Sequence, residues 1–111
     1  MSDLKMYIAV REEVPAHIVP VLVAHTVLNN DNAYNTSLNW NHIELYYEWK
    51  KESFKKCVVK VNKKEWDKII QIPNVFLGHE NSTLSGEKSC AIVPIMFEYP
   101  NVIKFAKLWQ P

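Results

Sequence analysis

Long apolar runs, glycine and cysteine are scarce in this chain of 111 residues, and each scarcity excludes a class of protein. No stretch approaches the ~18 consecutive apolar residues of a membrane-spanning helix, and the N-terminal segment has no signal-peptide pattern. Gly78 and Gly86 are the only glycines, which excludes a glycine-rich phosphate-binding loop. Cys57 and Cys90 are too few for a disulfide framework and lie in apolar runs, which predicts buried free thiols. We therefore expect a cytoplasmic protein without membrane contact.

The composition is that of one globular domain spanning residues 1–111. Apolar residues make up 48% and charged residues 23%, which is typical of a folded chain with one core. The net charge is +1, far from the basic balance of a dedicated nucleic-acid-binding protein. A cluster of lysines is either a solvated face or a patch that contacts phosphates. Its members are Lys50, Lys51, Lys55, Lys56, Lys60, Lys63, Lys64 and Lys68.

The first half of the chain predicts one strand and two helices. Residues 5–10 are β-prone and mostly apolar, as expected of a central strand. Residues 19–29 predict a helix whose apolar side chains surround its axis, so we expect it to be buried on all sides. The Asn-rich residues 29–41 predict a loop, and a second apolar helical stripe then ends near Ser53.

The second half predicts three strands and two helices. Residues 54–61 form the clearest strand, and Asn62 with Glu65 matches a capping box that opens a helix. Residues 75–78 and 90–97 predict two strands of a hairpin. Pro100 begins a terminal helix, because apolar residues follow it at helical spacing. The predicted fold is α/β, a four-stranded mixed sheet with helices on both faces in the order β-α-α-β-α-β-β-α.

His25 is the first candidate for chemistry. It is the only ionisable residue between Ile18 and Leu28, within the helix that we expect to be buried. A histidine in such a helix often only packs, with its hydrogen bonds satisfied, and this interpretation stays open. Imidazole also titrates near neutral pH, which suits a general acid or base. The same residue therefore predicts either a packing role or the centre of a cleft.

A polar run directly after the third predicted strand is the second candidate. Polar side chains at a strand end either line a site or form a hydrophilic hairpin loop. The run consists of His79, Glu80, Asn81, Ser82 and Thr83. The histidines of the chain have no metal-ligand spacing, so we expect no metal and no other cofactor.

Several segments together resemble the type II peptidyl-tRNA hydrolase family, over nearly the whole chain. Residues 5–14, ending Arg-Glu-Glu-Val, are similar to the family's opening strand with its Arg-x-Asp-Leu turn. Residues 23–25, Val-Ala-His, are similar to the Gln-x-x-His-Ala motif of its first helix. Residues 79–83 occupy the place of an Asp-Ala-Gly-x-Thr motif, and residues 92–94, Ile-Val-Pro, resemble the Ile-Gly-Pro that closes the last strand.

The chain departs from this family at the turn before the first helix. The family has a turn rich in glycine and lysine, whereas residues 16–18 are Ala-His-Ile, with His17 as the only basic side chain. Leu22 stands where the helix motif has glutamine, and Thr26 stands where it has alanine. The lysine that the family uses at this turn is therefore missing.

The resemblance implies hydrolysis of the ester bond between a peptide and tRNA. His25 and Thr83 match the family's catalytic positions, and the motif aspartate aligns with His79 or, after a slip of one residue, with Glu80. In this interpretation His25 activates water, Glu80 orients the imidazole, and Thr83 donates a hydrogen bond to the substrate carbonyl. The substrate-binding positions that it implies are Arg11, Glu13, His17 and Lys88.

Two function hypotheses follow. The first is a divergent peptidyl-tRNA hydrolase-like enzyme, which the retained His25 and Thr83 favour. The second is a non-catalytic binding module of the same fold that holds a nucleotide-like ligand, a tRNA end or a protein partner, which the missing lysine favours. We expect tRNA or a nucleotide-like ligand as partner, with a homodimer as a further hypothesis. The composition, rich in lysine and asparagine, suits an AT-rich genome such as that of a large phage.

Overall fold

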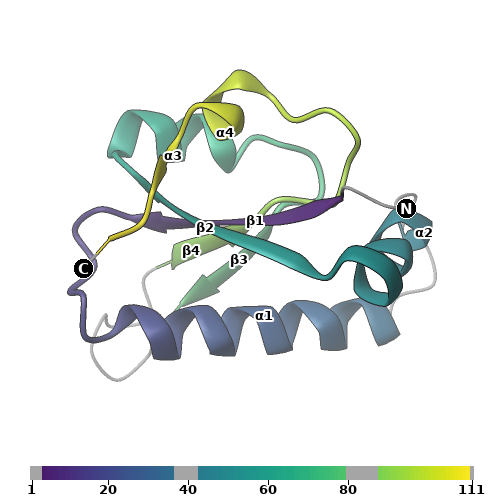
Figure 1. Cartoon of the computed structure of the whole chain (residues 1–111). Coiled ribbons are helices and arrows are strands. Elements are labelled where there is room, and N and C mark those ends of the chain that lie inside the picture. The colour runs from purple at the N-terminus through teal and green to yellow at the C-terminus, as the bar shows by residue number, and fades with distance from the viewer. Residues whose placement is uncertain (1–3, 37–42, 80–87, 111) are drawn as a thin grey trace.

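A mixed β-sheet lies between helices on both of its faces in the computed structural model of the chain (Figure 1). The structure describes residues 4–36, 43–79 and 88–110. The strands are β1 (Lys5–Arg11), β2 (Lys55–Val61), β3 (Phe76–His79), β4 (Lys88–Ile92) and β5 (Lys107–Leu108). The helices are α1 (Val19–Thr36), α2 (Ile43–Glu48), α3 (Lys63–Ile69) and α4 (Asn101–Lys104), with a π-helical turn η1 (Trp49–Ser53) directly after α2. The predicted class, α/β with a mixed sheet, is confirmed.

The strands follow the order β3-β4-β1-β2-β5, which places β1 at the centre of the sheet. β1 and β2 are parallel, with Lys5 opposite Lys55 and Arg11 opposite Val61, because the chain crosses over between them through α1 and α2. β4 is antiparallel to both β1 and β3. The predicted central strand, its parallel pairing with the second strand and the antiparallel pairing of the third and fourth strands are confirmed.

The end of the chain differs from the prediction of four strands and a terminal helix. Helix α4 ends at Lys104, and β5 adds a fifth strand antiparallel to β2, with Val59 opposite Leu108. Phe105, which the predicted apolar stripe included, is 76% exposed. Trp109 packs with the core on the α1 side of the sheet, and its backbone N–H donates to the Val58 carbonyl at 2.9 Å. The apolar spacing therefore reflects a short helix followed by an edge strand.

Alternate side chains of β1 enter the two helical layers. Met6, Ile8 and Val10 pack on the α1 side, while Tyr7 and Ala9 pack on the side of α3 and α4. Met6, Ile8, Ala9 and Val10 are buried and Tyr7 is half-buried, because helices cover both faces of this strand. This two-sided burial explains why β1 has a nearly continuous apolar sequence.

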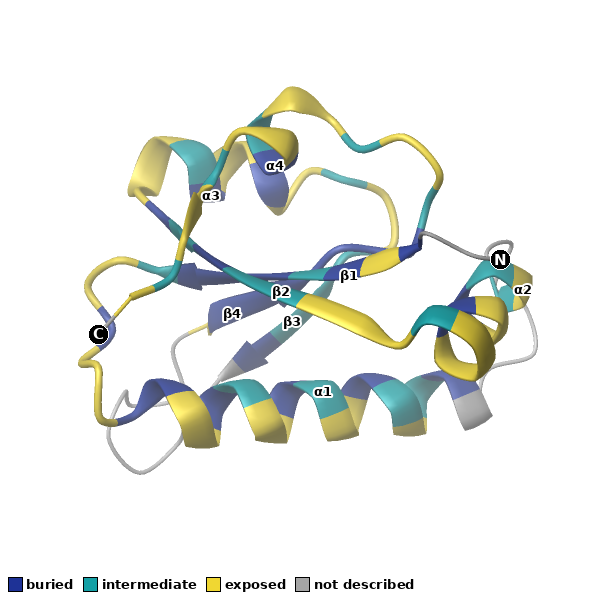
Figure 2. Ribbon diagram, in the orientation of Figure 1, coloured by how far each residue is buried: buried dark blue, intermediate teal, exposed yellow. Residues whose placement is uncertain are grey.

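Helix α1 is longer and less buried than predicted. It runs to Thr36, through much of the Asn-rich segment that predicted a loop. Leu22, Thr26, Asn30 and Tyr34 recur every four residues and are buried, so they form the stripe that packs inward. Figure 2 shows this burial on one side of α1 only, and Leu28 is 70% exposed, so the prediction of burial on all sides is wrong. Neither α1 nor another helix in the described part of the chain is long and apolar enough to cross a membrane.

The predicted capping box at the start of α3 is confirmed. The Glu65 N–H donates to Asn62 Oδ1 at 2.8 Å, and the Asn62 N–H donates to Glu65 Oε1 at 2.8 Å. Two otherwise unpaired backbone donors are thereby satisfied, and such a cap contributes about 1 kcal/mol. Trp66 and Ile69 of α3 are buried against the sheet.

Both cysteines are free thiols, as predicted, but only Cys90 is fully buried, whereas Cys57 is half-buried. Cys90 lies on β4 beneath α1, and burial raises the pKa of its thiol to about 12. Because the thiolate is the reactive form, a thiol held protonated in the core is inert.

We expect iodoacetamide at neutral pH to leave Cys90 unmodified in the native protein and to alkylate it after unfolding in guanidinium chloride. Mass spectrometry of proteolytic peptides would locate the label at each time point. Cys57 provides the internal comparison, because its side chain is partly accessible. Rapid native-state labelling of Cys90 would contradict the packing of α1 over β4.

Candidate functional site

Four of the residues predicted for the site lie at the edge of the sheet where β1 ends. Arg11 is the last residue of β1, and its Nη1 donates to the carbonyl of Lys88, where β4 begins, at 3.5 Å. Arg11 Nε lies 2.5 Å from Glu13 Oε1 in an ion pair. His79 ends β3 opposite Lys88. We call Arg11, Glu13, Lys88 and the backbone at His79 the sheet-end site.

The position of the sheet-end site suits ligand binding. β3 and β1 run in the same direction, since both are antiparallel to β4, so their carboxyl ends share this edge. In α/β sheets, ligands commonly bind outside the carboxyl ends of the strands. The Arg11 guanidinium also lies 5.7 Å from the centre of the Trp66 ring, and its side chain is only 18% exposed. An anionic ligand that binds Arg11 must therefore compete with Glu13.

His25 lies on the exposed side of α1, which corrects the prediction that its helix is buried all round. The next residue, Thr26, is buried, and its Oγ1 donates to the Leu22 carbonyl at 2.7 Å. Thr26 packs directly on Gly78, because a Cβ added to Gly78 would lie 2.6 Å from Thr26 Cγ2. The helical turn that carries His25 therefore contacts the residue of β3 that precedes His79.

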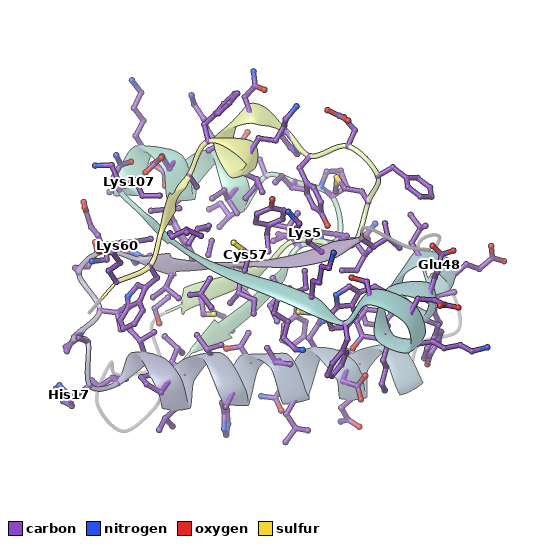
Figure 3. The ribbon with its side chains drawn as sticks, viewed as in Figure 1. Lys5, His17, Glu48, Cys57, Lys60 and Lys107 are labelled. Carbon is purple, nitrogen blue, oxygen red and sulfur yellow. The ribbon has the colours of Figure 1, made fainter. Side chains whose placement is uncertain are left out.

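The connection between β1 and α1 brings no cation to the sheet. His17 is exposed, and Figure 3 shows its side chain pointing away from the sheet. Ala16 is exposed as well, whereas Ile18 is buried in the core beneath α1. This turn thus offers accessible positions but no lysine.

Two predicted catalytic residues, Glu80 and Thr83, lie outside the described residues, and for His79 only the backbone is described. Their convergence with His25 stays a prediction. Within residues 4–36, 43–79 and 88–110, no three histidine, cysteine, aspartate or glutamate side chains are grouped to hold a metal ion.

A groove of about 700 Å³, which the sequence analysis did not predict, lies between α1 and β2. Ile8 of β1 and Val58 of β2 line it from the sheet, and Val23 and Val27 line it from α1. We call this feature the apolar groove. The sequence signal for it is the ring of apolar residues around α1, since Val23, Ala24, Val27 and Leu28 of that ring line this space.

Charged and aromatic groups meet at one end of the apolar groove. Lys50 Nζ and Tyr46 Oη both donate to Asp31 Oδ1, at 2.8 Å and 2.7 Å. Lys56 Nζ lies 3.3 Å from the centre of the Phe54 ring and donates to the Phe54 carbonyl at 2.8 Å. Desolvation lowers the pKa of Lys56, whereas burial, followed by the bond to Asp31, raises the pKa of Tyr46 and keeps its hydroxyl a donor.

The lysine cluster of the sequence is divided between the two faces of the sheet. Lys56 alternates along β2 with Cys57 and shares the α1 side with Val58. Lys63, Lys64 and Lys68 belong to α3, on the opposite face (Figure 1). A nucleic acid on either face therefore meets only part of the cluster.

Comparison of the chain with known protein families finds no family that matches, and comparison with curated proteins finds no match either. The resemblance to type II peptidyl-tRNA hydrolases therefore rests on the quoted motifs, and the function has to be argued from the sites themselves.

Proposed function

We propose that this protein is a divergent peptidyl-tRNA hydrolase-like enzyme that cleaves the ester bond between a peptide and tRNA at the sheet-end site. The contact between Thr26 and Gly78 is the observation that carries this proposal. It packs the turn of α1 that holds His25 against the strand that leads into His79, Glu80 and Thr83. The helix turn with the first motif thus lies next to the strand that precedes the second motif, although the two are distant in sequence.

In this mechanism His25 takes a proton from water as the water attacks the ester carbonyl, and it returns that proton to the ribose oxygen of the tRNA as the ester C–O bond breaks. Its exposure on α1 leaves it accessible to water and to a large substrate. Glu80 orients the imidazole, or His79 fills that position, and Thr83 donates a hydrogen bond to the carbonyl oxygen as negative charge develops on it. Arg11 and Lys88 supply cations for phosphates of the tRNA end, with His17 and Glu13 at the rim.

The experiment is release of labelled peptide from an N-acetylated aminoacyl-tRNA, measured at single turnover against the spontaneous rate. The unblocked aminoacyl-tRNA is the matched control, because the free amino group distinguishes it from the proposed substrate. Accelerated hydrolysis of the blocked substrate alone supports the proposal. A rate equal to the spontaneous one overturns it. Action on tRNA also implies a cytoplasmic location; a homodimer and a phage origin stay hypotheses.

The second candidate is a non-catalytic binding module of the same fold. The turn before α1 favours it, because Ala16 and His17 are exposed there and no lysine is present. Arg11 is already paired with Glu13, which weakens its availability for a phosphate. Such a module would hold a tRNA end or a nucleotide-like ligand at the same edge of the sheet, without turnover.

Introducing a cation at this turn, by Ala16→Lys, is expected to raise tRNA affinity if the sheet-end site receives a tRNA end. One added phosphate contact steepens the salt dependence of binding by roughly one unit of slope. Ile18 is unsuitable for this change, because a lysine there would place a charge in the core.

The measurement is tRNA binding over a salt series, with Gln71→Lys as the matched control. Gln71 is exposed at the end of α3, on the face away from α1, so the variant carries the same added charge at a distant place. A larger gain for Ala16→Lys than for Gln71→Lys supports tRNA at this edge. Equal gains would show that only net charge matters.

A further inference from the structure

The apolar groove is a second site, separate from the sheet-end site. The two sites lie on different sides of α1. Thr26 packs on Gly78 of β3, whereas Val23 and Val27 line the groove toward β2. Among the described residues, none of those assigned to catalysis or tRNA binding lines it. A ligand in the groove would therefore leave His25 accessible.

Two tryptophans bound the groove along β2. The backbone N–H of Trp109 donates to the Val58 carbonyl at 2.9 Å, and the indole Nε1 of Trp49 donates to the Lys55 carbonyl at 2.7 Å. Lys55 and Val58 are three positions apart on one strand, so roughly 10 Å separates these two anchor points. A space bounded in this way suits a small molecule better than a long helix of a partner protein, and about 700 Å³ lies within the range of small-molecule sites.

The body of the site is apolar and elongated. Along α1 it extends from Val19 to Asp31, which corresponds to about 18 Å at the rise of an α-helix. Ala24 and Leu28 continue the wall that Val23 and Val27 begin. Burying a hydrocarbon chain against such a surface is favourable, because it removes apolar area from water and breaks no hydrogen bond.

The charged groups at one end of the apolar groove favour a ligand with an anionic head group. Lys50 and Lys56 both line the groove there. Among the described lining residues the one carboxylate is that of Asp31, and it already accepts hydrogen bonds from Lys50 and Tyr46 at a single oxygen. A lysine ammonium has three donors, and among the described residues Lys56 directs one of them to the Phe54 carbonyl. Two exposed lysines thus carry ammonium groups at one end of a mostly apolar groove.

We propose that the apolar groove binds a single-chain anionic amphiphile, a long-chain carboxylate, with its alkyl chain along α1 and its carboxylate at Lys56 and Lys50. The apolar wall supplies most of the affinity, and the charge-assisted hydrogen bonds fix the direction of the ligand. This site is independent of the proposed hydrolysis, so failure of either proposal leaves the other standing.

The probe is dodecanoate, titrated below its micelle concentration and followed by calorimetry and by the fluorescence of the tryptophans. We expect saturable one-to-one binding and an affinity that rises roughly fourfold for each added methylene from decanoate to dodecanoate. Dodecanol and dodecylamine test the head group, and both should bind at least tenfold more weakly than dodecanoate. Equal binding of all three, or no saturable binding, would overturn the proposal.

Variants of the lining residues test the binding of the carboxylate and the binding of the alkyl chain separately. Lys56→Gln should weaken dodecanoate about tenfold while leaving dodecanol unchanged. Lys51→Gln is the matched control, since Lys51 is an exposed lysine of η1 that does not line the groove, and it should bind like the unmodified protein. Ala24→Trp, at an exposed helical position, should fill the groove and abolish binding of both probes. Undiminished dodecanoate binding by Ala24→Trp would show that the ligand binds elsewhere.

Discussion

Replacing His25 by alanine is expected to slow hydrolysis of N-acetylated aminoacyl-tRNA by roughly 10²–10⁴-fold, the usual cost of removing a general base. The imidazole is the group that we assign to proton removal from water, and alanine has no equivalent. His25 is exposed on α1, so its removal takes no side chain from the core and the variant should fold. Single-turnover kinetics with saturating protein measure the chemical step without a contribution from product release.

Asn29→Ala is the matched control for His25→Ala. Asn29 lies one helical turn further along the exposed side of α1, so both changes truncate a polar side chain on the same surface. We expect the rate of Asn29→Ala to equal that of the unmodified protein and both variants to keep its melting temperature. If His25→Ala stays active, the base lies elsewhere. If both variants slow equally, this surface of α1 acts in tRNA binding and His25 has no distinct role.

Replacing Gly78 by alanine is expected to destabilise the fold by about 2–3 kcal/mol, near the upper end for an overpacked site. An added Cβ would lie 2.6 Å from Thr26 Cγ2, 2.8 Å from Thr26 Cβ and closer still to Thr26 Oγ1. Thr26 is held on a helix and cannot swing aside, so α1 has to move away from β3. The opposite result, a small gain in stability, is what Gly→Ala gives where space allows, because alanine loses less chain entropy on folding.

The companion variant is Gly78→Ala combined with Thr26→Ala, measured by urea denaturation. The Thr26→Ala change removes the Oγ1 and Cγ2 atoms, which make the two closest contacts with the added Cβ, and leaves the contact with Thr26 Cβ. The double variant should therefore recover part of the loss, and the two changes should not be additive, as expected for residues in contact. Strict additivity would mean that α1 does not press on β3 at this point.

Elements whose signals are local could be predicted from the sequence. β1 and β2 have β-prone apolar runs, and the capping box of Asn62 and Glu65 needs residues only three positions apart. The pairing of β1 with β2 followed from the helices between them. These features depend on short-range chemistry, so the rest of the fold does not override them.

Two errors arose where tertiary packing decides the structure. Residues 29–36 predicted a loop because asparagine favours turns, but Tyr34 stacks on Tyr46 with ring centres 3.7 Å apart, and this buried contact extends α1. At the C-terminus the helical spacing of Phe105 and Trp109 is coincidental, because Trp109 packs on the core next to β2 while Phe105 faces solvent. Propensity is a weak guide in both places.

The candidate sites also combine features that the sequence predicted with features that depend on tertiary packing. The motifs predicted that His25 and residues 79–83 belong together; the structure shows that Thr26 packs on Gly78, and the position of residues 80–83 relative to His25 stays a prediction. The exposure of His25 was not predictable, because a helix with apolar residues all round is typical of complete burial. In this fold the additional apolar residues of α1, such as Leu28, instead line a groove that arises because α1 covers β3 and β4 and leaves β2 open on that face.

The central position of β1 has a consequence for how the chain reaches this structure. β1 is synthesised before both of its partner strands, since Lys5 pairs with Lys55 and Ile8 pairs with Ile92. Its apolar side chains stay exposed until these distant partners have emerged, and closing such long loops is slow relative to local helix formation. During translation β1 therefore lacks its β4 neighbour until residues 88–92 have left the ribosome, and an unpaired apolar strand is prone to aggregation in that interval.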